Sequence, residues 1–202
     1  TMKKIKAGII GVGNCAQSLV EGVQYYTEND TEVGLMYPEI GGYKSSDIEF
    51  VIGFDVDRRK VNRPLTEALR AAPNCAMNHV EEIMESGDNS PGAVAPGAMV
   101  YSSPTLDGVA EWMEYYPEEV SFRVGAEAAK SFDDIVKLIK SSGVEVLVNY
   151  LPVGSEKATR FYIDVAIAAG VHFVNCIPTL IETKETQQIE QRFINAGLTF
   201  VG

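Results

Sequence analysis

Two patterns of apolar positions alternate along this chain. Short, nearly continuous apolar runs are typical of strands buried on both faces, and they are followed by segments whose apolar residues recur every three or four positions, as on one face of a helix. Strands that alternate with helices form right-handed βαβ units, so the pattern predicts one α/β domain over residues 1–202, a Rossmann-type, doubly wound parallel sheet. The predicted strands are residues 5–10, 47–57, 99–101, 144–150, 172–176 and 198–201.

Helical spacing is expected in the segments between these strands. Ser131, with Asp134 three residues later, is an N-cap signal, and Gly143 should end that helix. Ser155 should cap the next helix, which Gly170 closes. The other predicted helices are one that includes residues 16–23, one over 61–72 that becomes regular near Pro64, a short one over 81–86, one over 107–116 and one over 183–196.

Two stretches between the predicted elements should be loops. Residues 26–46 are polar and rich in glycine, which indicates an insertion, and loops of that length are often functional. Residues 87–97 form a second loop by composition. The aromatic side chains of Trp112, Tyr115 and Tyr116 are expected to pack rather than to form a binding platform.

The first predicted strand ends in a glycine turn of the form G-x-G-x-x-A. A strand before the turn and an amphipathic helix after it are the context in which this pattern indicates a dinucleotide site. The first glycine allows the sharp turn, the second leaves room for a pyrophosphate to approach the backbone, and the alanine lets helix and strand pack closely. The free N–H groups of the helix N-terminus would face the phosphates. The residues of the turn are Gly11, Val12, Gly13, Asn14, Cys15 and Ala16.

Two carboxylates, Asp55 and Asp57, stand at the end of the second predicted strand. In a Rossmann fold a carboxylate there binds the hydroxyl groups of the adenosine ribose, and it would repel the 2′-phosphate of NADP, which favours NAD. Arg58, Arg59 and Lys60 follow at once and argue the other way, because basic side chains could hold a phosphate. Both aspartates could also be solvated turn residues.

Further polar residues are expected at the same edge of the sheet, since ligands bind outside the carboxyl ends of parallel strands. Ser102 follows the third predicted strand, and Asn149 and Asn175 lie in otherwise apolar strands. A buried amide needs hydrogen-bond partners. Each asparagine therefore either ties neighbouring loops together or holds cofactor and substrate, and both interpretations stay open.

Composition narrows the range of partners. The chain has 202 residues, 46% of them hydrophobic, and a net charge of −11, which fits a globular domain and makes binding to nucleic acid unfavourable. Cys15, Cys75 and Cys176 are widely spaced, so neither a disulfide framework nor a metal site is predicted. His79 and His172 show no ligand pattern and are expected to be structural. We find no secretory signal pattern and no apolar run that could span a membrane, so we expect a cytoplasmic protein.

Several segments together resemble one protein family, the archaeal and actinobacterial inositol-phosphate synthases. They are GIIGVGNCAQSLVEGVQYY, GFDVDRRKV, PTLDGVAEWMEYYPE, EVLVNYLPVGSEKATRFY and FVNCIP. The resemblance covers essentially all of residues 3–202. It implies conversion of D-glucose 6-phosphate to an inositol monophosphate with NAD bound throughout. NAD oxidises C5, the ketone enolises at C6, an intramolecular aldol step closes the ring, and NADH returns the hydride.

The resemblance also implies cofactor contacts. The glycine turn would bind the pyrophosphate of NAD, and Asp55 and Asp57 would bind the adenosine ribose. Independently of the resemblance, Ser102 is also expected to contact the cofactor, because the end of the third strand lies at the same edge of the sheet. The residues that would line the nicotinamide side are Asn149, Tyr150, Leu151, Pro152 and Val153.

The family's catalytic groups are expected outside these residues. In the family, a lysine-containing segment and a second domain follow residue 202, carry most catalytic lysines and the phosphate site, and build a homotetramer. Lys157 and Lys184 do not match those catalytic positions, so we assign no catalytic residue here and expect the chain alone to bind NAD with little or no synthase activity. Two other interpretations stay open: a stand-alone NAD-binding regulatory module, and an NAD-dependent sugar-phosphate dehydrogenase.

Overall fold

One parallel sheet organises the molecule. The structure, a computed structural model, describes residues 3–87, 90–178 and 183–202. Within these residues six parallel strands lie in the order β5-β2-β1-β6-β7-β8. This order, with its reversal between β1 and β6, confirms the predicted doubly wound Rossmann-type sheet. The strands are β1 Ile5–Ile10, β2 Ile48–Asp55, β5 Val100–Ser102, β6 Val146–Asn149, β7 His172–Asn175 and β8 Phe200–Val201.

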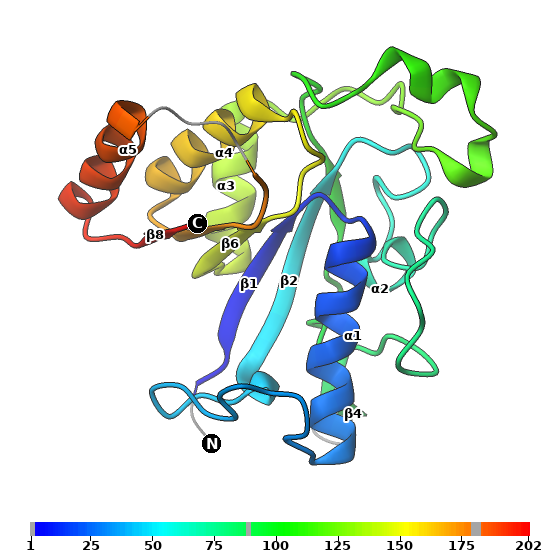
Figure 1. Cartoon of the computed structure of the whole chain (residues 1–202), viewed down its shortest axis with the longest axis vertical. Coiled ribbons are helices and arrows are strands. Elements are labelled where there is room, and N and C mark those ends of the chain that lie inside the picture. The colour runs from blue at the N-terminus through cyan, green and yellow to red at the C-terminus, as the bar shows by residue number, and fades with distance from the viewer. Residues whose placement is uncertain (1–2, 88–89, 179–182) are drawn as a thin grey trace.

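Helices cover both faces of the sheet (Figure 1). On one face α1, Asn14–Asn29, and the short α2, Leu65–Ala68, close a core that includes Ile9 and Val20. On the other face Phe54 and Tyr162 belong to a second core. The helices over that core are α3 Phe132–Ser142, α4 Glu156–Ala169 and α5 Thr183–Asn195.

The ends of α3 and α4 only partly follow the sequence signals. The Ser131 hydroxyl accepts a hydrogen bond from the Asp134 N–H at 3.2 Å, and Gly143 ends α3 at φ 71°, as predicted. Gly170 likewise ends α4 at φ 77°. Ser155 precedes α4, but its side chain makes no capping hydrogen bond, so that part of the prediction is wrong.

Two predicted helices are shortened or absent. The predicted helix over 61–72 shrinks to α2, because the backbone of Asn62 and Arg63 pairs instead with Val100 at the edge of the sheet. The predicted helix over 81–86 is wrong. There the Gln24 side chain of α1 donates to the Glu82 carbonyl and accepts from the Met84 N–H, which uses backbone groups that a helix would need.

The two predicted loops also differ from expectation. Helix α1 continues to Asn29, so the insertion starts at Asp30, which has φ 44°, and a 3₁₀ turn, η1 Ser45–Asp47, closes it. In Figure 1 this loop lies at the end of the sheet where β1 begins. In the other loop the short strands β3, Ser86–Gly87, and β4, Ser90–Pro91, pair, while residues 88 and 89 lie outside the described part of the chain.

We call residues 104–124 the strap, the segment that follows β5 and is drawn in green at the upper right of Figure 1. It holds two 3₁₀ turns, η2 Glu111–Tyr115 and η3 Glu118–Val120, where a longer helix was predicted. Trp112, Tyr115 and Tyr116 are exposed on it, so the prediction that they pack is wrong. Trp112 and Tyr116 contact each other edge to face, with ring centroids 5.7 Å apart.

Candidate nucleotide-binding site

A cavity lies at the carboxyl ends of four neighbouring strands. It encloses about 850 Å³ of empty space, part of it open to solvent. The loops after β1, β2, β5 and β6 all contribute to its wall, and residues of the strap close one side. This is the place where the strand order reverses, and where open α/β sheets bind their ligands.

The glycine turn forms one wall of the cavity. Gly11 has φ +83°, and a Cβ there would lie 2.7 Å from the carbonyl oxygen of Tyr150, so no other residue fits. A Cβ on Gly13 would meet nothing within 4 Å, so the space above it is open. Gly13 is also the N-cap of α1, which has no side-chain cap and no acidic residue in its first turn. Its positive end is therefore open to an anion.

The other residues of the turn support it. Val12 and Ala16 are buried in the core under the turn. The side-chain oxygen of Asn14 accepts the N–H groups of Cys75 and Ala76 at 2.7 and 3.0 Å, which ties the turn to the segment after α2. Cys15 is exposed and lines a separate shallow hollow beside Tyr150.

Asp55 lies in the wall of the cavity, at the end of β2. One carboxylate oxygen accepts the N–H of Val12 at 2.8 Å, and the other accepts the N–H groups of Val56 and Asp57 at 2.7 and 2.8 Å. These bonds fix the carboxylate against the glycine turn. A carboxylate has about four lone-pair positions, so one acceptor position remains for a ligand.

Asp57 lies elsewhere. It is fully buried and does not line the cavity. Its carboxylate accepts two hydrogen bonds from the Arg59 guanidinium, at 2.9 and 2.6 Å, and one from the N–H of Arg123 at 3.0 Å. Burial alone would raise the pKa of Asp57, but these hydrogen bonds outweigh it and lower that pKa. Asp57 therefore anchors the strap, and the structure offers it no face toward a ribose.

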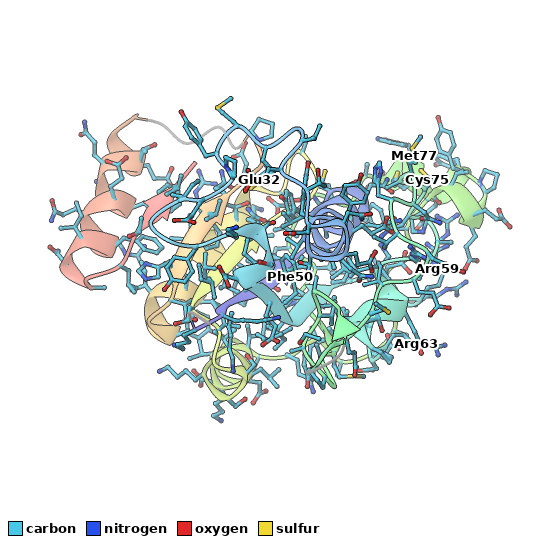
Figure 2. All side chains as sticks on the ribbon, turned by 90° about the horizontal axis from the view of Figure 1, so that it is seen from below. Glu32, Phe50, Arg59, Arg63, Cys75 and Met77 are labelled. Carbon is cyan, nitrogen blue, oxygen red and sulfur yellow. The ribbon has the colours of Figure 1, made fainter. Side chains whose placement is uncertain are left out.

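The three basic residues after Asp57 all have partners. Arg58 makes two 2.6 Å hydrogen bonds to the carboxylate of Glu118 on the strap. Arg59 binds Asp57 and also donates to two backbone carbonyls of the strap. Lys60 is buried and donates to the Val12 carbonyl. In Figure 2, Arg59 and Cys75 lie at the end of the molecule that carries the strap. The Arg59 guanidinium is fully engaged, whereas the Arg58 guanidinium is half-exposed and bonded through one nitrogen to Glu118.

Ser103 lines the cavity at the end of β5, whereas the sequence pattern pointed to Ser102. Ser102 is buried, and its hydroxyl donates to the Ala128 carbonyl at 3.3 Å, away from the cavity. Ser103 lines the cavity and accepts a 2.8 Å hydrogen bond from the Tyr162 hydroxyl. Side chains alternate along a strand, so a one-residue shift reverses the direction in which a side chain points. The pair Ser102-Ser103 gave no basis for choosing between them.

The β6 end carries Asn149, Tyr150 and the turn after them. Asn149 is buried; its amide donates to Thr159 and Asn175, and its oxygen accepts the N–H of Leu151. It thus ties β6 to α4 and β7, which favours the structural one of the two open interpretations. Tyr150, Leu151 and Pro152 line the cavity, whereas Val153 is exposed outside it. Burial, with the Cys176 thiol nearby, raises the pKa of Tyr150 to about 12, so its phenol is neutral at pH 7.

The N-terminus of α4 is occupied by a side chain from the strap. The carboxylate of Asp107 accepts the N–H groups of Lys157 and Ala158 at 2.6 and 3.0 Å. Asp107 therefore takes the capping role that was predicted for Ser155. Because the Asp107 carboxylate occupies the N-terminus of α4, the helix N-terminus that remains open at this cavity is that of α1.

His172 has the structural role that was predicted for it. Its Nδ1 accepts the N–H of Thr199 at 3.0 Å, which links β7 to the segment before β8. Among the described residues, no helix is both long and apolar enough to cross a membrane.

The strand order, the glycine turn at the start of α1 and the carboxylate at the end of β2 define a Rossmann-type α/β domain. The chain is homologous to the actinobacterial inositol-3-phosphate synthases. It is 42% identical over 202 residues to inositol-3-phosphate synthase of Mycolicibacterium smegmatis, with 98% of this chain and 50% of that protein covered. It is 38% identical over 201 residues to the synthase of Corynebacterium glutamicum, again with 98% of this chain and 50% of that protein covered.

Solved structures show the same fold. The crystal structure of Ari2 superposes on 99% of this chain and 52% of its own, with a TM-score of 0.75 and 29% identity. A myo-inositol-1-phosphate synthase-related protein of Thermotoga maritima MSB8 gives a TM-score of 0.69 over 98% of this chain and 54% of its own, at 19% identity. No family model matches the chain. The chain spans about half the length of the curated relatives it matches.

Proposed function

We propose that this chain is the NAD-binding part of an inositol-3-phosphate synthase, an NAD-dependent isomerase of inositol and inositol phospholipid biosynthesis. The observation that carries the proposal is the open helix N-terminus beside Gly13, at the strand-order reversal, in a chain homologous to these synthases. The full protein would convert D-glucose 6-phosphate to 1D-myo-inositol 3-phosphate. We infer from the homology that it works as a homotetramer, and from its three unpaired cysteines that it acts in the cytoplasm.

The residues present fit NAD. The N-terminus of α1 and the open space over Gly13 suit a pyrophosphate. The remaining acceptor position of Asp55 suits a ribose hydroxyl. Tyr150, which follows β6 on the other side of β1 from Asp55, suits the nicotinamide half, which would accept and return the hydride of the sugar.

The same geometry favours NAD over NADP. Asp55 places a carboxylate at the adenosine end, and the neighbouring guanidinium groups of Arg58 and Arg59 are held by Glu118 and Asp57. A 2′-phosphate would meet a negative charge, and each of the two guanidinium groups nearby is already paired with a carboxylate. We expect the affinity for NAD to exceed the affinity for NADP by at least tenfold.

The described part of the cavity offers little for the cyclisation itself. An enolate and an alkoxide need a nearby cation or hydrogen-bond donor, and Lys60 is the one lysine that lines the cavity. Its ammonium already donates to the Val12 carbonyl and to Asn74, at the adenosine end. We therefore assign no catalytic residue to these 202 residues and expect no cyclisation by them alone.

The test is turnover of D-glucose 6-phosphate by the protein purified from its native source, after its intact mass has been measured. An inositol phosphate formed without accumulation of NADH supports the synthase. Steady NADH formation instead identifies a dehydrogenase. An intact mass near 22.0 kDa with NAD binding but no turnover identifies a stand-alone NAD-binding module.

A further inference from the structure

Lys60 is an unusual lysine. It is 3% exposed, lies in the segment between β2 and α2, and lines the nucleotide cavity. Buried lysines are rare because removing the ammonium from water is unfavourable. Burial accordingly lowers the pKa of Lys60, while Asp55 and Asp57 oppose that shift. A charge kept at such a position calls for a partner that compensates for the lost water.

The protein supplies only part of that compensation. The ammonium donates to the Val12 carbonyl and to the side-chain oxygen of Asn74, each at 2.7 Å. Both acceptors are neutral, and within the described part of the chain no carboxylate lies within 4.0 Å of the ammonium. An ammonium has three donors, so one N–H is left without an acceptor from the described residues.

Asp55 and Lys60 bind the two backbone groups of one residue, Val12. The Asp55 carboxylate accepts the N–H of Val12 while Lys60 donates to the carbonyl of Val12, so the two side chains hold the glycine turn from either end of one residue. Both line the cavity. One acceptor position of the carboxylate and one donor of the ammonium therefore remain on two residues that line the same cavity and bind the same turn.

We infer that Lys60 is a cofactor-contacting residue, which donates a hydrogen bond to a hydroxyl of the adenosine ribose while that hydroxyl donates to Asp55. This inference rests on the proposed function. A hydroxyl donates and accepts at once, so a single hydroxyl satisfies both unused positions. A phosphate only accepts when it is ionised, and in this corner it would meet the carboxylate of Asp55.

The test compares ADP with 2′-deoxy-ADP and 3′-deoxy-ADP by titration calorimetry, in the wild-type chain and in Lys60→Met. In the wild type we expect removal of one of the two hydroxyls to weaken binding about tenfold, because bonds to charged groups are the stronger ones. In Lys60→Met we expect ADP to bind more weakly and the deoxy analogue to lose clearly less than in the wild type relative to ADP, because only the bond to Asp55 remains. The ratio of two affinities in one variant does not depend on how much of that variant is folded.

Two variants serve as controls. Lys137→Met changes an exposed lysine on α3 and should leave the tenfold ratio unchanged. Lys60→Leu, which also removes the donor, repeats the comparison if Lys60→Met does not fold.

The outcomes separate the two proposals. A wild-type chain that binds neither NAD nor ADP refutes the proposed function and this inference with it. A wild-type chain that binds both, with the same tenfold ratio kept in Lys60→Met, overturns the inference alone. In that case Lys60 only supports the glycine turn, and its loss weakens the binding of ADP and of both deoxy analogues equally.

Discussion

Gly11 and Gly13 stand two residues apart in one turn, and the structure predicts opposite effects for the same substitution. Gly13→Ala adds a Cβ to open space at φ −96°, an ordinary backbone conformation. Gly11→Ala adds a Cβ at φ +83°, 2.7 Å from the Tyr150 carbonyl oxygen. The first change should spare the fold and impair nucleotide binding, and the second should impair the fold.

The magnitudes follow from the geometry. At Gly11 the left-handed backbone adds about 1–2 kcal/mol of strain, and displacing a packed backbone carbonyl adds about 1–3 kcal/mol. At Gly13 the change from glycine to alanine at an N-cap lowers stability by about 0.5–1 kcal/mol. A domain of this size loses about 2–4 °C of Tm for each kcal/mol. We therefore expect a fall of about 5–15 °C for Gly11→Ala and at most about 4 °C for Gly13→Ala.

The affinity for NAD, in contrast, should fall more in Gly13→Ala than in Gly11→Ala. A methyl group on Gly13 would hold a pyrophosphate away from the N–H groups of α1, and the loss of one charge-assisted hydrogen bond corresponds to about a tenfold or greater loss of affinity. Scanning calorimetry gives the Tm values, and titration calorimetry with NAD gives the affinities. Wild-type NAD affinity in a folded Gly13→Ala variant would refute the placement of the pyrophosphate over Gly13.

Three further predictions concern aspartates in and around the cavity. Asp57→Asn should lower the free energy of unfolding by about 3 kcal/mol at pH 7, because it leaves Arg59 without its buried partner. Since folding lowers the pKa of Asp57, its contribution to stability is complete above about pH 4 and disappears as the pH falls through the lowered pKa. Urea unfolding of the two proteins should therefore show a smaller difference in stability at pH 3 than at pH 7. Equal stability of the two proteins at pH 7 would contradict this role. Asp107→Ala should lower Tm by about 2–4 °C through loss of the α4 cap, whereas Ser155→Ala should not remove a capping bond; a larger effect of Ser155→Ala would restore Ser155 as the cap. Asp55→Asn should narrow the preference for NAD over NADP, measured as the ratio of the two dissociation constants, and an unchanged ratio would show that Asp55 does not set it.

The parts of the site that lie in consecutive residues could be predicted from the sequence. The glycine turn and Asp55 depend on a strand end, a tight turn and a helix start, and each leaves a local pattern. The doubly wound parallel sheet followed from the regular alternation of strands and helices. Both could be recognised without knowledge of distant contacts.

The remaining parts depend on partners far along the chain. Asp55 and Asp57 look alike in the sequence, but the N–H of Arg123 and the side chain of Arg59 hold Asp57 in the interior. Asp107 caps a helix that begins about fifty residues later, so the helix pattern pointed to Ser155 instead. In the sequence Lys60 is one of three consecutive basic residues that could hold a phosphate, and only the fold shows that its ammonium binds the glycine turn.

Titration of the purified 202-residue chain with NAD tests the central claim most directly. The account predicts saturable binding of one NAD per chain, at least tenfold weaker binding of NADP, and no inositol phosphate when D-glucose 6-phosphate is added. Absence of binding at millimolar NAD to a folded chain would contradict the proposed nucleotide site. Formation of inositol phosphate by these residues alone would contradict the conclusion that they hold no complete catalytic machinery.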